Sequence, residues 1–110
     1  MSNEALIQRQ LDAYNAQDLD AYIACYAPDV VVAQLNGTVT EKGREELRAR
    51  YAKAFAAFPE NKAHLKNRIV VGGTVIDREH VVRKPGGEEF EIIAIYTIKD
   101  GLIARVDFAK

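Results

Sequence analysis

Four side chains that could carry acid–base chemistry fall into two short stretches, Arg78 with His80 and Arg105 with Asp107. Each pair is spaced i, i+2, so both members point to the same face of a strand. A histidine, with an ordinary pKa of about 6.5, or an aspartate can move a proton. An arginine can stabilise negative charge that develops on a carbonyl or epoxide oxygen. We therefore expect His80, Arg105 and Asp107 to be catalytic and Arg78 to contact a ligand.

The pair formed by Arg105 and Asp107 also has a structural interpretation. The two side chains could simply pair with each other, because pairing offsets part of the cost of burying two charges. The arginine would then hold the pKa of Asp107 low and make this residue a poor base at neutral pH. His80 could likewise be a half-exposed strand residue with no role in chemistry.

Metal and nucleophile chemistry find little support in the sequence. Cys-x-x-Cys and His-Glu-x-x-His motifs are absent, and the two histidines, His64 and His80, are far apart. We therefore expect no metal site and no cofactor. Cys25, the single cysteine, has few neighbours that would activate a thiol, so we expect a small buried apolar side chain.

The composition is typical of one soluble globular domain spanning residues 1–110, with 48% hydrophobic and 28% charged residues. Fifteen Lys and Arg against sixteen Asp and Glu leave no positive field for nucleic acid. No apolar run is long enough for a membrane span. The first residues lack the pattern of a signal peptide, so we expect a cytoplasmic protein.

Hydrophobic periodicity predicts helices at residues 3–16 and 43–58, with a shorter helix between Asp18 and Pro28. A strand is predicted at 29–35. From residue 62 onward the pattern changes to period two, with glycine-containing turns between the runs. It predicts a four-stranded antiparallel meander in an α+β domain, with strands at 63–71, 74–84, 89–98 and 102–108.

Turn lengths predict which residues of the meander share a face. A two-residue turn at Gly72-Gly73 sets Arg68 opposite Asp77 and Lys66 opposite Glu79, so that face is expected to be a charge ladder, solvated or dimeric. A hairpin around residues 85–88 then sets His80 opposite Ile93 and Arg78 opposite Ile95, on the other face.

The last hairpin has two possible registers. A two-residue turn at Asp100-Gly101 sets Tyr96 opposite Arg105 and turns Arg105 and Asp107 outward. A three-residue loop from Lys99 to Gly101 sets Ile95 opposite Arg105 and Ile93 opposite Asp107. We favour the second register, in which Arg105 and Asp107 share a face with Arg78 and His80.

Three stretches of the sequence resemble the SnoaL-like proteins: NAQDLDAYIACYAPDVVV at residues 15–32, GREEL at 43–47 and AIYTIKDGLIARVDF at 94–108. These proteins share a superfamily with nuclear transport factor 2, ketosteroid isomerase and limonene epoxide hydrolase. The resemblance covers nearly the whole chain. It implies a cystatin-like roll, in which three helices from the N-terminal half close a cone of strongly curved antiparallel sheet around a pocket.

The resemblance places the face that carries His80 and Asp107 inside this cone. The pocket would then suit a small, largely apolar organic molecule. Beside the catalytic candidates, the residues expected to contact the ligand are Tyr14, Tyr26, Gln34, Tyr51, Phe55, Arg78, Ile93 and Ile95.

The chain departs from ketosteroid isomerase at the three positions that carry the family reaction. Gln34 falls at the position of the general base, Gln10 at that of the oxyanion-hole tyrosine, and Ile95 at that of the protonated aspartic acid. The resemblance therefore implies the fold and the pocket, and no catalytic assignment.

Two functions are compatible with these observations. The first is a cofactor-independent isomerase, cyclase or hydrolase that uses general acid–base chemistry. The second is a non-catalytic ligand-binding or dimerisation module. For the second we expect a homodimer through an apolar outer sheet face formed by Phe90, Ile92, Ala94, Tyr96, Ala104, Val106 and Phe108.

Overall fold

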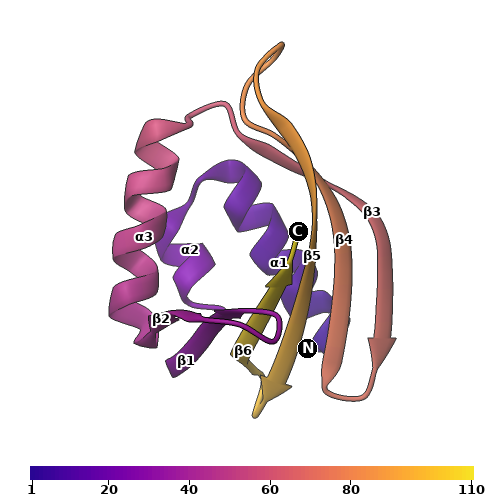
Figure 1. Cartoon of the computed structure of the whole chain (residues 1–110). Helices are drawn as coiled ribbons and strands as arrows, with labels where there is room; N and C mark the ends of the chain where they lie inside the picture. Colours follow the sequence, from indigo (N-terminus) through magenta and orange to yellow (C-terminus); the bar gives the residue numbers. More distant parts are fainter.

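Two helices, α1 (Asn3–Ala16) and α2 (Leu19–Ile23), open the chain, and a third, α3 (Gly43–Ala57), follows the first pair of strands. The structure is a computed structural model that describes all residues from 1 to 110. Its strands are β1 (Tyr26–Gln34), β2 (Val39–Lys42), β3 (Lys62–Val71), β4 (Thr74–Val82), β5 (Glu89–Lys99) and β6 (Leu102–Ala109) (Figure 1). None of the helices is long and apolar enough to cross a membrane.

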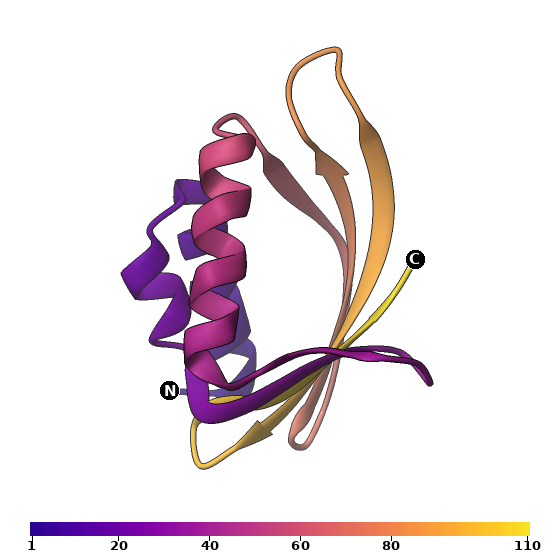
Figure 2. The same cartoon turned by 60° about the vertical axis from the view of Figure 1, so that its left-hand side comes forward.

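The six strands form one sheet in the order β2-β1-β6-β5-β4-β3. β1 runs parallel to β6, and every other neighbouring pair is antiparallel. The sheet is strongly curved, and the three helices cover its concave side (Figure 2). The predicted α+β architecture, a curved sheet closed by three helices, is therefore confirmed.

Local signals in the sequence account for most element boundaries. The Ser2 hydroxyl accepts a hydrogen bond from the Ala5 N–H at 3.0 Å and caps α1. The Asp18 carboxylate accepts one from the Ala21 N–H at 3.2 Å and caps α2. α2 ends at Ile23, earlier than predicted, so Pro28 lies inside β1 instead of ending a helix. β2 pairs with β1 only from Val31 onward, which leaves that edge free at the proline.

Two bulges and one shift change the predicted register of the sheet. Arg68 lies opposite Asp77, as predicted, but a bulge between Leu65 and Asn67 places Leu65 opposite Glu79. The predicted pairing of Lys66 with Glu79 is therefore wrong. Between β4 and β5 the register is shifted by two residues from the prediction, with His80 opposite Glu91 and Arg78 opposite Ile93.

The last hairpin follows neither of the two predicted registers. Asp100 and Gly101 form a two-residue turn with φ of 52° and 77°, which the Asp-Gly pair adopts readily. A bulge between Thr97 and Ile98 then shifts the ladder, so that Arg105 lies opposite Thr97. The three-residue loop that we favoured is therefore wrong, although the predicted set of residues that share the face of Arg105 is right.

The face of the sheet that carries Arg105 is the outer face, whereas the prediction placed it inside the cone. Along β4 the buried residues are Val75, Asp77, Glu79 and Val81, whereas Arg78 is exposed. On β5 and β6, Ala94, Tyr96 and Val106 are buried, and the main core cluster includes all three. The apolar set that we expected at an outer dimer interface therefore points mainly toward the helices, because that is where the large apolar side chains are buried.

Candidate functional site

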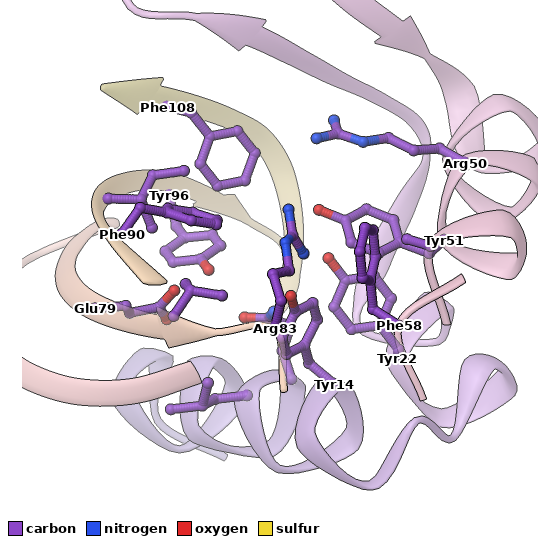
Figure 3. A pocket seen from close by; sticks show the side chains of 15 residues that line it. Tyr14, Tyr22, Arg50, Tyr51, Phe58, Glu79, Arg83, Phe90, Tyr96 and Phe108 are labelled. Carbon is purple, nitrogen blue, oxygen red and sulfur yellow. The ribbon is translucent and has the colours of Figure 1, made fainter. Parts of the chain in front are cut away.

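A cavity of about 180 Å³ lies between the helices and the concave face of the sheet. Most of its wall is aromatic or aliphatic, and α1, α2 and α3 face β4, β5 and β6 across it (Figure 3). Its lining residues are Gln10, Leu11, Tyr14, Tyr22, Arg50, Tyr51, Ala54, Phe58, Glu79, Val81, Arg83, Phe90, Ile92, Tyr96 and Phe108.

The cavity continues outward into a second hollow of about 540 Å³. Arg50, Arg83 and Phe108 are among the residues that line both spaces, and Gln34 lines only the outer one. The two arginines therefore lie where the two spaces meet, at a position that we call the mouth. An apolar cavity with a few convergent polar groups is the usual form of a small-molecule site.

Glu79 is the acidic residue of the cavity wall. Glu79 is 7% exposed, and its carboxylate points into the cavity (Figure 3). Burial, followed by the nearby charge of Asp77, raises the pKa of this carboxyl to about 7, although the Arg68 guanidinium lowers it in part. No hydrogen bond contributes to the shift. A carboxyl with this pKa can accept or release a proton at neutral pH.

A buried ion pair lies next to Glu79 along β4. Arg68 donates from Nε to Asp77 Oδ1 at 2.7 Å and from Nη2 to Asp77 Oδ2 at 2.9 Å. Its third nitrogen, Nη1, donates to Gln8 Oε1 of α1 at 2.9 Å. Asp77 is completely buried and the Arg68 side chain is 8% exposed. The pair thus satisfies both charges, while Glu79 beside it faces the cavity.

Tyrosine hydroxyls form the other polar groups of the cavity. Burial raises the pKa of Tyr22 and Tyr96 well above the ordinary value and that of Tyr14 to a smaller extent, so all three remain protonated at neutral pH. The rings of Tyr22 and Tyr51 are 4.7 Å apart between centroids, which fixes this wall by packing. The cavity therefore offers hydrogen-bond donors to a ligand oxygen.

Asn61 orients the Tyr14 hydroxyl. Arg83 Nη1 donates to Asn61 Oδ1 at 3.0 Å, and because arginine can only donate, this bond fixes which way the amide points. Asn61 Nδ2 then donates to Tyr14 Oη at 2.7 Å. The Tyr14 oxygen is thus an acceptor in this bond, and its own proton is free to be donated elsewhere, including into the cavity that Tyr14 lines.

Only some of the predicted ligand-binding residues on the helices and β1 line the cavity or the hollow. Tyr14 and Tyr51 line the inner cavity, and Gln34 lines the outer hollow. Tyr26 is fully buried and donates a hydrogen bond to the Tyr22 hydroxyl at 2.9 Å, so Tyr22 rather than Tyr26 reaches the cavity. Phe55 packs against Tyr14 at 5.7 Å between ring centroids and does not line the cavity.

The other predicted site residues lie on the outer face of the sheet, where His80 and the three charged residues each pair with an acidic or basic side chain. Arg105 binds Asp107 at 3.0 Å and His80 binds Glu89 at 2.7 Å. Arg78 binds Glu91 at 2.7 Å. The predicted position inside the cone is therefore wrong for His80, Arg105, Asp107, Arg78, Ile93 and Ile95, because this face of the strands points away from the helices. Their catalytic or ligand-binding role stays a prediction.

The sequence reasoning missed Glu79 and Arg83 as site residues. A signal was available, because both have the parity of Val75 and Val81 on β4, with Arg83 one residue past the end of this strand. In a one-sided sheet, the face that carries the apolar residues is the one that packs on the helices. No three His, Cys, Asp or Glu side chains of the structure gather where they could hold a metal ion.

Comparison with known proteins gives one family and several solved structures. The model of the SnoaL-like domain matches residues 7–106. Curated protein sequences give no significant match. An uncharacterised cystatin-fold protein from Novosphingobium aromaticivorans is 36% identical, with a TM-score of 0.93 over 100% of this chain and 99% of that one.

Two further solved structures are those of candidate enzymes. A candidate polyketide cyclase from Sinorhizobium meliloti is 26% identical, with a TM-score of 0.82 over 99% of this chain and 100% of that one. A candidate ketosteroid isomerase from Kribbella flavida is 18% identical, with a TM-score of 0.82 over 96% of this chain and 75% of that one. At the latter identity the similarity shows the fold alone.

Proposed function

The chain belongs to the SnoaL-like domain family, and on this premise we propose that it is a cofactor-independent enzyme in which Glu79 transfers a proton to and from a small organic substrate. The observation that carries the proposal is a buried carboxyl, without a hydrogen-bond partner and with a pKa of about 7, that faces an aromatic cavity. Perturbed acids in apolar pockets are characteristic of sites that perform acid–base catalysis.

The proposed reaction begins at a C–H bond next to a carbonyl group. The Glu79 carboxylate accepts the proton, and the electron pair of the C–H bond moves into the carbonyl to form an enolate. Glu79, now protonated, then returns the proton. Delivery to a different carbon of the same enolate gives an isomerisation, whereas attack of the enolate carbon on a second carbonyl of the substrate, followed by protonation of the alkoxide, gives a cyclisation.

Tyrosine hydroxyls provide the complementary group for the enolate oxygen. Tyr14 is the strongest candidate, because Asn61 occupies its oxygen as a donor and leaves its proton available. Tyr96 is a second candidate, since its hydroxyl stays protonated and it lines the same wall as Glu79 (Figure 3). Donors that are already oriented toward developing negative charge stabilise the transition state more than mobile ones do.

A non-catalytic ligand-binding domain is the second candidate function. It is favoured by the side chains at the positions of the isomerase machinery, Gln10, Gln34 and Ile95, none of which can exchange a proton at neutral pH. The two functions share the cavity and differ only in whether Glu79 performs chemistry. An experiment on proton transfer therefore separates them.

Exchange of the α-hydrogens of 2-tetralone for deuterium in D2O tests the proposal. We expect the protein to accelerate this exchange, with a rate that rises with pH through about 7 as the Glu79 carboxylate forms. Glu79→Gln is expected to lower the protein-dependent rate by about 100-fold, the usual scale of a lost general base. Mass spectrometry of the recovered ketone measures the rate. No acceleration by the wild-type protein, or equal rates for both proteins, would contradict the proposal.

Three alanine variants on the outer face test the residues that the sequence suggested. His80→Ala, Arg105→Ala and Asp107→Ala are expected to exchange 2-tetralone at the wild-type rate, because their side chains lie on the outer face and do not line the cavity. A loss of exchange in these variants, with a normal rate in Glu79→Gln, would move the reaction to the outer face of the sheet.

A further inference from the structure

We propose, resting on the proposed function, that the substrate carries a carboxylate, which Arg83 binds at the mouth while the apolar body of the substrate extends inward toward Glu79. Arg83 lines both the inner cavity and the outer hollow, so a ligand that enters through the hollow passes it. Three features of Arg83 support this assignment: its packing, its free donors and its positive charge at the mouth.

Two aromatic rings hold the Arg83 guanidinium in place. Its Cζ lies 4.6 Å from the ring centroid of Phe58 and 4.9 Å from that of Phe90. Figure 3 shows Arg83 between the two rings. Aromatic rings attract a guanidinium and cover its faces, which leaves the N–H edge as the polar surface available to a ligand. A planar carboxylate binds such an edge with two parallel hydrogen bonds.

Most of the donors on this edge have no partner within the protein. The only side-chain hydrogen bond that Arg83 donates runs from Nη1 to Asn61. Nε is buried and has no partner, and the closest carboxylate oxygen, from Glu88, lies 3.8 Å away, beyond hydrogen-bond distance. A buried donor without a partner is unfavourable, because it has lost its hydrogen bonds to water. Nη2 also donates to no protein group and is not buried, so a carboxylate could bind the guanidinium there.

The second arginine at the mouth contributes charge but is already paired. Arg50 Nη1 donates to Glu41 Oε1 at 2.7 Å, so its charge is largely balanced. Arg83 makes only a loose ion pair with Glu88, at 3.8 Å and with the Glu88 side chain 66% exposed, so solvent screens this partner and Arg83 keeps more of its positive charge at the mouth. At the inner end the Glu79 carboxylate would repel a second anion. The charge distribution thus favours one orientation, with the anionic group outside and the reactive carbon inside.

Calorimetric titration with 2-naphthylacetate and its neutral analogue 2-naphthylacetamide tests the proposal. The two probes share an apolar body and differ in the charge of the head group. We expect the wild-type protein to bind the acid at least about tenfold more tightly than the amide. Arg83→Gln is expected to reduce this preference to about twofold or less, and Arg83→Lys to an intermediate value, because lysine keeps the charge but loses the planar fork.

Arg48→Gln is the matched control. Arg48 makes an exposed ion pair with Asp20 and does not line the cavity or the hollow, so the preference for the acid should persist. Equal affinities for the two probes, failure of the acid to bind, or a preference that survives Arg83→Gln would overturn the proposal. Since 2-tetralone has no carboxylate, its exchange reports on Glu79 alone, and a failure of either proposal is seen separately.

Discussion

Glutamine in place of Glu79 is expected to increase the free energy of unfolding at pH 8 by about 3 kcal/mol. The carboxyl has a pKa of about 7 in the folded protein and close to 4.5 when unfolded. Below pH 4 it is protonated in both states and costs nothing. As the pH rises from 4.5 to 7 it ionises first in the unfolded chain, so the folded wild-type protein loses stability over this window. Glutamine has no such charge to bury.

Urea unfolding of both proteins at pH 5 and pH 8 measures this effect. The stability difference between Glu79→Gln and the wild type should be small at pH 5 and should grow toward pH 8, because other groups titrate alike in both proteins and cancel. Glu91→Gln, on the exposed outer face of β5, is the matched control and should show the same difference at both pH values. A difference for Glu79→Gln that does not change with pH would contradict the assigned pKa.

Arg68→Met is expected to destabilise the protein by about 3–5 kcal/mol, the scale of a buried ion pair that loses one partner. The change leaves the fully buried Asp77 carboxylate without its two hydrogen bonds and removes the link from β3 to Gln8 of α1. Urea unfolding measures the loss. The double variant Arg68→Met/Asp77→Asn should recover part of it, since the second change removes the unpaired charge.

Single substitutions of the two ion-pair residues, Arg68→Met and Asp77→Asn, should shift the pH dependence of proton transfer in opposite directions. Arg68 lowers the pKa of Glu79 and Asp77 raises it. In Arg68→Met the 2-tetralone exchange profile should therefore move to higher pH, and in Asp77→Asn to lower pH. If both variants fold but the profile moves in neither, the group that titrates is not Glu79.

The local elements of the fold could be predicted from the sequence, because their signals are local. α1 was predicted at its observed limits, from the cap at Ser2 and the helical spacing of its apolar residues. The four strands of the meander end within two residues of their predicted limits, since turns that contain glycine separate them. β2 was missed because it is short and exposed, with no alternating pattern to reveal it.

The sidedness of the sheet could not be derived from the charged residues alone. Both faces of β4 carry charges, Asp77 and Glu79 on one and Arg78 and His80 on the other, so alternation is ambiguous there. The aromatic residues of β5 and β6 were the better guide. Their rings bury a large apolar area, and the free energy gained in this way is larger than what pairing the charges on the other face could contribute. The face that carries the rings therefore packs on the helices.

Glu79 was missed for a related reason. The sequence suggested that Lys66 lies opposite Glu79 and neutralises it, but the bulge in β3 removes that partner. A single inserted residue of this kind leaves no trace in the periodicity of the neighbouring strand. The unpaired carboxyl that supports the proposed function is thus a result of tertiary register rather than of any motif.

Glu79 and Arg83 lie four residues apart on one chain segment, with Val81 between them on the same face. Four residues of extended strand span about 13 Å between Cα atoms. Arg83 follows Val82, the last residue of β4, so the extended backbone of this strand sets most of the distance between the anchor and the acid. Substrate length would then be selected by the backbone, whereas substitutions on the helices could alter only the width of the molecules that fit.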